Sequence, residues 1–438
     1  MFRFPSFRSI LISADKNNKV VRKRNRIYVV SSLSLLNVAM IEKQYFGFVW
    51  PLSADRKQMP EGLLDRVNLL QKEGFTVFKI QLFYQADPDF SLSTCQQELV
   101  RFFSIHFSGR VPAISIAVQP PVSENLLEAE LWCVPATADC RFDTFNGLPF
   151  VEITHENICE MWSSGLTADY LSVPNGIHPV QEAAKACFEK VSELLHHTGY
   201  SYDNIFRQWN YVGHILKLSS IADKTVQNYQ LFNEIRAVYY QNKQDRSQYP
   251  AATGIGMDYA GIGIDFVAVK DLSGQTGRDM PMKSPVQKDA YRYQNEVLVG
   301  ESLLFTSSDH TAKQAPLFER GRCFLTEKDG RNTALAMISG TASIRGEETV
   351  NQNDLVRQTE NTLRFIDELA QESALQDIRY QRARMYLKPG QNVEKAVRIF
   401  QDRYPAGCLC TVVQAEVCRE NLLVEIETDL KATRTMQA

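Results

Sequence analysis

The chain has 438 residues, of which 44% are hydrophobic and 23% charged, a composition typical of folded globular proteins rather than disordered ones. The 48 basic and 51 acidic residues leave a formal net charge of -3, so no overall field favours nucleic acid or an anionic membrane. The nine cysteines are odd in number and lie mostly in apolar stretches, as reduced thiols do in the cytosol. We therefore expect a cytoplasmic protein that binds neither nucleic acid nor membrane.

Residues 1–30 are predicted to form a basic N-terminal arm, because lysines and arginines recur between Arg3 and Arg26. The largely uncharged run at 29–41 is too short to span a bilayer and lacks the small-residue cleavage site of a signal peptide. A solvated arm that leads into a first strand is therefore a better interpretation than a targeting segment.

The first half of the remaining chain begins with strands and continues with a helix, a strand and a helix. Runs rich in apolar, β-branched and aromatic residues predict the early strands at 47–50, 76–83, 113–118 and 131–134. The apolar residues Ala186, Val191, Leu194 and Leu195 then predict an amphipathic helix. A strand at 205–211 and a helix at 226–240 follow.

The second half repeats this order. Its strands are predicted at 262–269 and 334–339, and Leu363, Ile366 and Leu369 recur at the spacing of an amphipathic helix. A strand at 378–387 and a helix at 393–404 come next, whereas the stretch 271–287, rich in Gly, Pro, Ser and charge, predicts an exposed loop.

The repeated helix, strand, helix order predicts an α/β (α+β) protein with two similar domains. We place them at 31–242 and 250–438, with a boundary in the polar stretch 241–249. Each is expected to be a mixed β-sheet with helices packed on one face.

The last predicted strand has an acidic face. Leu423, Glu425 and Glu427 alternate with Val424 and Ile426, so the two glutamates lie on one side of the strand. An edge strand with a solvated acidic face fits this pattern as well as a functional site does.

Four blocks of sequence resemble the chorismatases, two-domain members of the RidA (YjgF) superfamily that act on chorismate. They span residues 207–427 and follow the family's order, and the blocks at 250–256 and 339–344 are its specific signature. The blocks read Arg207-Gln-Trp-Asn-Tyr211 with Tyr229-x-x-Phe-Asn-x-x-Arg236, Pro250-Ala-Ala-Thr-Gly-Ile-Gly256, Ser339-Gly-Thr-Ala-Ser-Ile344 with Gly346-x-Glu-Thr349, and Val417-Cys-Arg-x-x-Leu-Leu-Val-Glu-Ile426.

The resemblance implies that Glu425 is the general acid, that the active site lies in the C-terminal domain, and that the substrate is chorismate or a related small anion. Glu425 would protonate the enolpyruvyl methylene, after which water or a substrate hydroxyl completes cleavage and pyruvate leaves. The other product would be a hydroxybenzoate or a dihydroxycyclohexadiene carboxylate. Such an acid must hold its proton near neutral pH, and burial beside apolar neighbours raises a carboxyl pKa in that direction.

The resemblance also implies substrate-binding residues. Cys418 matches the cysteine that separates members giving 3-hydroxybenzoate from those giving a dihydrodiol, and Ala342 and Thr341 fall in the turn that lines the pocket. A packed thiol and a plain turn are the structural alternatives. Chorismate carries two carboxylates, and arginine binds a carboxylate with paired hydrogen bonds. The remaining candidates are Arg403, Arg207, Arg320 and Tyr211, which could instead be solvated, ion-paired or packed in the core.

Two departures from the family pattern bear on the substrate. The segment 310–320 keeps Lys313, Pro316, Phe318 and Arg320 but lacks the tyrosine that belongs to the family's pocket. Glu347 stands where the family has a histidine, which adds a negative charge near the expected site of an anionic substrate.

No metal or cofactor site is predicted. The seven histidines include no H-x-H or H-x-x-x-H pair, and Cys408 and Cys410 have neither a nearby histidine nor a second cysteine pair. The segment 250–256 lacks the Gly-Lys-Ser/Thr of a phosphate loop.

Other functions remain open: a RidA-type enamine deaminase, a non-catalytic protein that binds small carboxylates, or a partner-binding scaffold that has lost its pocket. A monomer is expected, because two domains in one chain can bury surface that single-domain relatives bury by trimerising.

Overall fold

A computed structural model describes residues 21–23, 26–28, 43–107, 109–123, 125–171, 178–221, 223–241, 249–273, 279–304, 313–328, 331–404 and 408–434. Most of the predicted basic arm lies outside these residues. Within it, only β1 (Val21–Lys23) and β2 (Arg26–Tyr28) are described, as an antiparallel pair. In the described part of the chain, no helix is long and apolar enough to cross a membrane.

The first of three larger sheets has four strands in the order β3-β6-β4-β5 and is accompanied by two helices. Alternation of buried and half-buried residues along its first strand matches a sheet with one covered face. The elements are β3 (Gln44–Pro51), α1 (Met59–Lys72), β4 (Phe75–Tyr84), α2 (Leu92–His106), β5 (Ala113–Ala117) and β6 (Asn125–Pro135), with the 3-10 helix η1 (Arg56–Gln58) before α1.

The second sheet has six strands in the order β13-β10-β14-β9-β8-β7. A small ribbon of β11 (Leu218–Ile221) and β12 (Lys224–Gln227) leads into its second helix. The elements are β7 (Asp139–Phe145), β8 (Leu148–His155), β9 (Ile158–Asp169), α3 (Pro179–His197), η2 (Tyr202–Asn204), β10 (Ile205–Gly213), α4 (Asn228–Tyr240), β13 (Ala251–Met257) and β14 (Gly261–Asp271).

The third sheet also has six strands, in the order β15-β16-β17-β22-β20-β21. Its elements are β15 (Asp279–Met282), η3 (Ala290–Arg292), η4 (Asn295–Val297), β16 (Gly321–Lys328), β17 (Arg331–Ala342), α5 (Leu355–Glu372), β20 (Leu375–Leu387), α6 (Val393–Arg403), β21 (Leu409–Gln414) and β22 (Val424–Arg434). A short hairpin of β18 (Ile344–Arg345) and β19 (Glu348–Thr349) follows β17. The predicted helix in this region is confirmed, since Leu363, Ile366 and Leu369 are buried on one face of α5.

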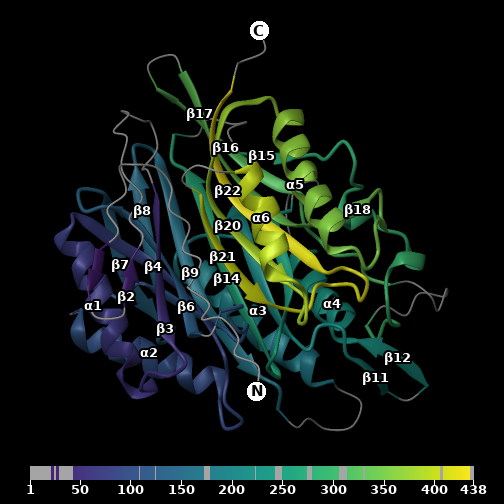
Figure 1. The fold of residues 1–438 in the computed structure, drawn as a ribbon, viewed down its shortest axis with the longest axis horizontal. Helices are drawn as coiled ribbons and strands as arrows, with labels where there is room; N and C mark the ends of the chain where they lie inside the picture. The colour runs from purple at the N-terminus through teal and green to yellow at the C-terminus, as the bar shows by residue number, and fades with distance from the viewer. Residues whose placement is uncertain are drawn as a thin grey trace, which may run out of the picture.

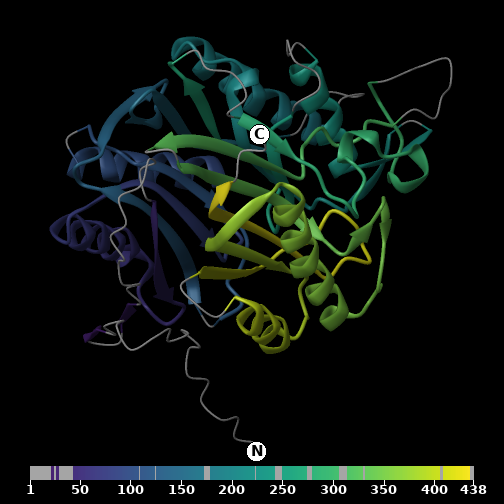
Figure 2. The same cartoon turned by 90° about the horizontal axis from the view of Figure 1, so that it is seen from above.

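All three sheets share one wiring. A strand, a helix, a strand, a helix and two further strands follow each other as β3-α1-β4-α2-β5-β6, β9-α3-β10-α4-β13-β14 and β17-α5-β20-α6-β21-β22. We call these groups unit 1 (residues 44–135), unit 2 (139–271) and unit 3 (279–434). Figures 1 and 2 show the three helix pairs on the outside of the molecule, with the strands between them.

The α+β class is confirmed, and the topology differs from the expected division in three places. Residues 44–135 form a four-stranded sheet of their own, and this unit lacks the two leading strands that precede β9 and β17 in the other units. The strands β13 and β14 pair with β10, so the second sheet continues past the predicted boundary at 241–249. The predicted loop at 271–287 contains the edge strand β15.

Buried ion pairs link the units in a ring. In each pair, the acid comes from the last strand of one unit and the cation from the strand between the two helices of another. The pairs are Lys79–Asp265 at 2.7 Å, Arg207–Glu427 at 2.8 Å and Arg384–Glu130 at 2.8 Å. Removing one partner of such a pair typically costs about 3–5 kcal/mol, because the other charge stays buried. The stability of each unit therefore depends on its contacts with the other two.

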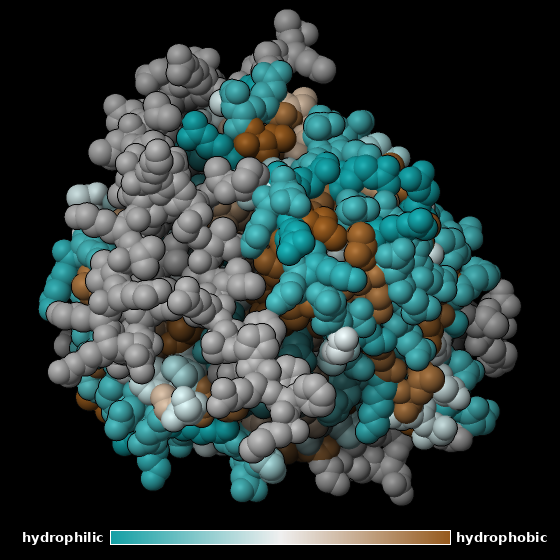
Figure 3. Space-filling model, viewed as in Figure 1, coloured by the Kyte–Doolittle hydropathy of each residue, from teal (hydrophilic) through white to brown (hydrophobic). Residues whose placement is uncertain are grey.

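The outer surface contrasts with this charged interior. Figure 3 shows the face that carries α5 and α6 as mostly hydrophilic, interrupted by small hydrophobic areas. In the interior, Trp132 packs edge-on against Trp162 and Trp209, close to the ion-pair ring.

Candidate active site

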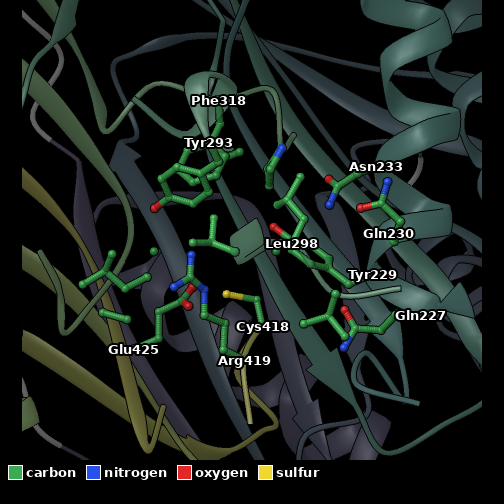
Figure 4. Close-up of a pocket in the computed structure, with 18 of the residues that line it drawn as sticks. Gln227, Tyr229, Gln230, Asn233, Tyr293, Leu298, Phe318, Cys418, Arg419 and Glu425 are labelled. Atoms are coloured by element: carbon green, nitrogen blue, oxygen red, sulfur yellow. The ribbon is translucent and has the colours of Figure 1, made fainter. Parts of the chain in front are cut away.

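A cavity lies between unit 2 and unit 3. Figure 4 shows Glu425, Cys418 and Arg419 gathered on one side of it and residues of α4 on the other, with Tyr293 and Phe318 at a third side. The lining residues are Gln227, Tyr229, Gln230, Asn233, Ala252, Gly254, Tyr293, Val297, Leu298, Val299, Pro316, Phe318, Arg320, Gly340, Ala342, Ile344, Cys418, Arg419 and Glu425.

Glu425 belongs to the floor of this cavity. It lies on β22, directly opposite Ala342 on β17, and its residue surface is only 4% exposed. The pairing of β17 with β22 is irregular between Ile338 and Thr341, and Gly340 lies within this irregular stretch. A Cβ atom at Gly340 would overlap Oε1 of Glu425, so the carboxyl lies directly against the glycine.

The two glutamates of β22 have opposite protonation preferences. Burial, assisted by the charge of Glu427, raises the pKa of Glu425 from 4.5 to about 8, although Arg207 and Arg320 oppose the shift. Burial also acts on Glu427, but Arg384, Arg207 and Arg382 hold its pKa well below its usual range. Glu425 is thus a neutral carboxylic acid at pH 7 beside a fixed carboxylate, and such a split separates an acid from a charged neighbour.

Two guanidinium groups reach the cavity. Arg320 donates from Nε and Nη2 to the carbonyl oxygen of Lys288 at 3.2 and 2.6 Å, and from Nη2 to the Tyr293 hydroxyl at 2.6 Å. Its Nη1 has no hydrogen-bond partner among the residues that the structure describes. Arg419 donates from Nη1 to the carbonyl oxygen of Glu347 at 2.7 Å. The cavity can therefore hold carboxylates by charge-assisted hydrogen bonds.

A phenol enters the cavity from another part of the chain than the family pattern suggests. Residues 305–312, which include the position where the expected tyrosine is missing, lie outside the described residues. Tyr293, between η3 and η4, instead places its hydroxyl on Arg320, and its ring lies 5.4 Å from the Arg419 guanidinium.

Glu347 does not line the cavity. Its carboxylate accepts hydrogen bonds from Nζ of Lys288 at 3.0 and 3.1 Å and from the backbone N–H of Gln294 at 2.9 Å. The Gln294 N–H and the Lys288 charge hold the pKa of Glu347 below its ordinary value. The extra negative charge noted in the sequence is thus paired, and it helps to fix the segment that carries Tyr293.

Four of the predicted site residues, Glu425, Cys418, Ala342 and Arg320, line the cavity. Burial raises the pKa of the Cys418 thiol to about 12, with a further contribution from Glu425. Cys418 is therefore a neutral thiol that can shape the pocket or donate a weak hydrogen bond, and it is no thiolate nucleophile.

Arg207 and Tyr211 lie behind the cavity, in the ion-pair ring. Arg207 binds Glu427, and the Tyr211 hydroxyl donates to Oε1 of Gln81 at 3.2 Å and accepts from Arg384 at 3.2 Å. Both residues are fully buried among these partners. The resemblance suggested both as substrate-binding residues, but their side chains contact the other two units rather than the cavity.

Arg403 and Thr341 also lie outside the cavity lining, which corrects their predicted role as ligands. Arg403 ends α6 and forms an ion pair with Asp367 while its side chain remains 41% exposed. Thr341 donates its hydroxyl hydrogen bond to the carbonyl oxygen of Ser339 at 2.9 Å. Thr341 and Ala342 lie at the end of strand β17 rather than in a turn, and Ala342 is the one of the two that lines the cavity.

Several lining residues were missed from the sequence. Gln230 and Asn233 are only 3% exposed, although both are polar residues on α4. Amides on the buried face of a helix are unusual, and this would have been a usable signal. Arg419 follows Cys418 directly in a quoted block, whereas Tyr293 lies in a segment without any recognisable pattern.

The comparisons with known proteins agree on one family. The family profile "Chorismatase FkbO/Hyg5-like, N-terminal" matches residues 151–268. A 3-hydroxybenzoate synthase from Streptomyces hygroscopicus is 27% identical over 348 residues, which are 71% of this chain and 93% of the relative. A chorismatase from Streptomyces rapamycinicus is 26% identical over 280 residues, which are 60% of this chain and 74% of the relative.

A solved chorismatase structure has a similar fold. It matches with a TM-score of 0.57 and 18% identity over 90% of this chain and all of that chain. The resemblance drawn from the four sequence blocks is therefore confirmed.

Within the described residues, no three His, Cys, Asp or Glu side chains are grouped so that they could hold a metal ion.

Proposed function

We propose, from the premise that the chain belongs to the chorismatase family, that it cleaves the enolpyruvyl ether of chorismate and releases pyruvate. One observation carries the proposal: Glu425, a carboxyl with a pKa of about 8, lines a cavity that also holds Arg320 and Arg419. A proton donor and two carboxylate-binding cations are what an acid-catalysed cleavage of this dicarboxylate requires.

The chemistry begins with transfer of the Glu425 proton to the methylene carbon of the enol ether. The electron pair of the double bond forms the new C–H bond, and positive charge develops on the adjacent carbon and the ether oxygen. The ionised Glu427, held two residues away on the same strand face, favours that charge electrostatically. Water adds to this cation and loses a proton, and the resulting hemiketal breaks its bond to the ether oxygen, so that pyruvate leaves and the oxygen stays on the ring as a hydroxyl. Loss of one water molecule from the ring diol then gives a hydroxybenzoate.

The proposed second product is 3-hydroxybenzoate. Cys418 lines the cavity beside Glu425, and the relative from Streptomyces hygroscopicus is named a 3-hydroxybenzoate synthase. Incubation with chorismate followed by chromatography should yield pyruvate and 3-hydroxybenzoate in equal amounts. A dihydrodiol instead would overturn the product assignment, and absence of pyruvate would favour the enamine deaminase or the carboxylate-binding protein.

The rate of pyruvate release should fall at alkaline pH. The general acid acts only when protonated, so activity is fully present below the pKa of Glu425, about 8, and is lost as pH rises above it. We expect kcat/KM to decrease about tenfold per pH unit above the pKa, as for a single ionisation. The measurement is kcat/KM for chorismate between pH 6 and 10. A profile that stays flat to pH 10 would contradict the assignment.

We also propose that the protein acts as a monomer in the cytosol. The three units already bury their sheets against one another within one chain, and the ring of ion pairs is closed without a second copy. The nine cysteines are compatible with a reducing compartment.

A further inference from the structure

The two signature blocks of the sequence meet beneath Glu425. The strand β13 of unit 2 runs beside the end of β17 in unit 3, and side chains join the two backbones. The N–H of Ala252 donates to Oγ of Ser339 at 2.9 Å, and that hydroxyl donates to the carbonyl oxygen of Glu319 at 2.6 Å. One residue further on, the N–H of Gly340 donates to Oγ1 of Thr253 at 3.0 Å.

The Thr253 hydroxyl has three partners. It accepts from Nη2 of Arg207 at 2.5 Å and from the Gly340 N–H, and it donates to Oε2 of Glu427 at 2.6 Å. A hydroxyl offers one donor and two acceptor positions, so its capacity is fully used. Thr253 is 1% exposed, and neither Arg207 nor Glu427 has measurable exposure. The position of this oxygen is therefore fixed by charged groups that cannot turn to solvent.

The same hydroxyl holds the Gly340 backbone through this hydrogen bond, and the Glu425 carboxyl packs directly against Gly340. A Cβ atom at Gly340 would meet both Oε1 of Glu425 and Cγ2 of Thr253. A shift of the Gly340 backbone by part of an ångström would thus move the carboxyl or open a gap beneath it. Displacements of about 1 Å in a reacting group can cost on the order of 100-fold in rate.

We propose that Thr253 is a positioning residue for the reaction, which ties the backbone of Gly340 to the Arg207–Glu427 ion pair and thereby holds Glu425 in place. This inference rests on the proposed function of Glu425 as the acid. It gives Arg207 a role behind the site rather than in it. It also explains why the two signature blocks, 87 residues apart at Thr253 and Gly340, belong together.

The test replaces Thr253 by Val, which keeps the branched shape and removes the hydroxyl. We expect kcat for pyruvate release from chorismate to fall about 10- to 100-fold, with KM within about twofold of wild type, since no substrate contact is lost. Thr253→Ser keeps the hydroxyl and should restore kcat to within about threefold. A purely structural role would lower the unfolding temperature without this split between kcat and KM.

The matched control is Thr428→Val. Thr428 is also a 1% exposed threonine, on the opposite face of β22, and donates to the carbonyl oxygen of Arg382 at 2.7 Å. Its replacement should leave kcat unchanged. If Thr253→Val does not fold, Thr253→Cys, which keeps a small side chain with only a weak sulfur acceptor, should show the same loss of kcat.

Three results would overturn the inference: wild-type kcat in Thr253→Val, a serine variant as slow as the valine variant, or an equal loss in Thr428→Val. Glu425→Gln in the same assay separates this failure from failure of the proposed function. An active Glu425→Gln would remove the acid itself. An inactive Glu425→Gln beside an active Thr253→Val would remove only the positioning role.

Discussion

Replacement of Glu425 by Gln is expected to abolish pyruvate release from chorismate, with a fall in kcat of about 100- to 10,000-fold. The amide has nearly the size of the carboxylic acid, but it has no proton acidic enough to transfer to carbon. The rate is followed by coupling pyruvate to lactate dehydrogenase. Glu360→Gln, an exposed position on α5, is the matched control and should have the wild-type rate.

The same substitution should not weaken the fold. The pKa of Glu425 rises from 4.5 to about 8 in the folded chain, so the unfolded chain loses its proton first as pH increases. The contribution of Glu425 to the free energy of unfolding of the wild type therefore decreases between about pH 4.5 and 8, and a neutral amide removes this loss. At pH 8 we expect Glu425→Gln to unfold at or above the wild-type temperature. An inactive variant that melts far below wild type would not support the acid role, and a fully active variant would contradict it.

Replacement of Gly340 by Ala is expected to lower kcat by about 100-fold or more, because a small displacement of a reacting group has effects of this size. The added Cβ would occupy the place of Oε1 of Glu425. The carboxyl is the end of a flexible side chain, so it will move aside while the sheet remains intact. The backbone of Gly340 is not in the left-handed region, which leaves steric overlap as the cause.

Gly47→Ala is the matched control for this variant. Gly47 is also a strand glycine, and a Cβ there would meet only Cδ1 of Leu409, at 4.0 Å. Pyruvate release and thermal unfolding are measured for both. A Gly340→Ala variant that folds and turns over like wild type would show that the carboxyl can act from a different position, against the proposed geometry.

Local patterns in the sequence predicted the strand that carries the acid. The alternation of Glu425 and Glu427 with Val424 and Ile426 placed both glutamates on one face, and the structure has them there on β22. Alternation does not reveal which of the two is protonated. That depends on Arg207 and Arg384, which arrive from β10 and β20 through long-range packing.

Local sequence patterns also do not determine which of the candidate arginines lines the cavity. Arg403 and Arg320 are both close to motif positions, yet one ends a surface helix beside Asp367 and the other faces the cavity. Helix and strand periodicity does not determine which arginine finds a surface carboxylate. Likewise, Tyr293 enters the site from an irregular segment held by Glu347, a contact between residues far apart in the chain.

The spacing of apolar residues along its helices does not reveal that unit 1 resembles units 2 and 3. Its strands at 76–83 and 113–118 were predicted, but their sheet lacks the two leading strands that mark the other units. The shared wiring becomes visible only in the strand order, where β6, β14 and β22 all lie inside their sheets and each carries one acid of the ring.

The role of Glu425 in chorismate cleavage is tested by the initial rate of pyruvate formation at pH 7, measured for the unaltered chain beside Glu425→Gln. We expect steady turnover by the wild type and none above background by the variant. Pyruvate formation at equal rates, or none from either protein, would show that Glu425 is not the acid of a chorismate-cleaving enzyme.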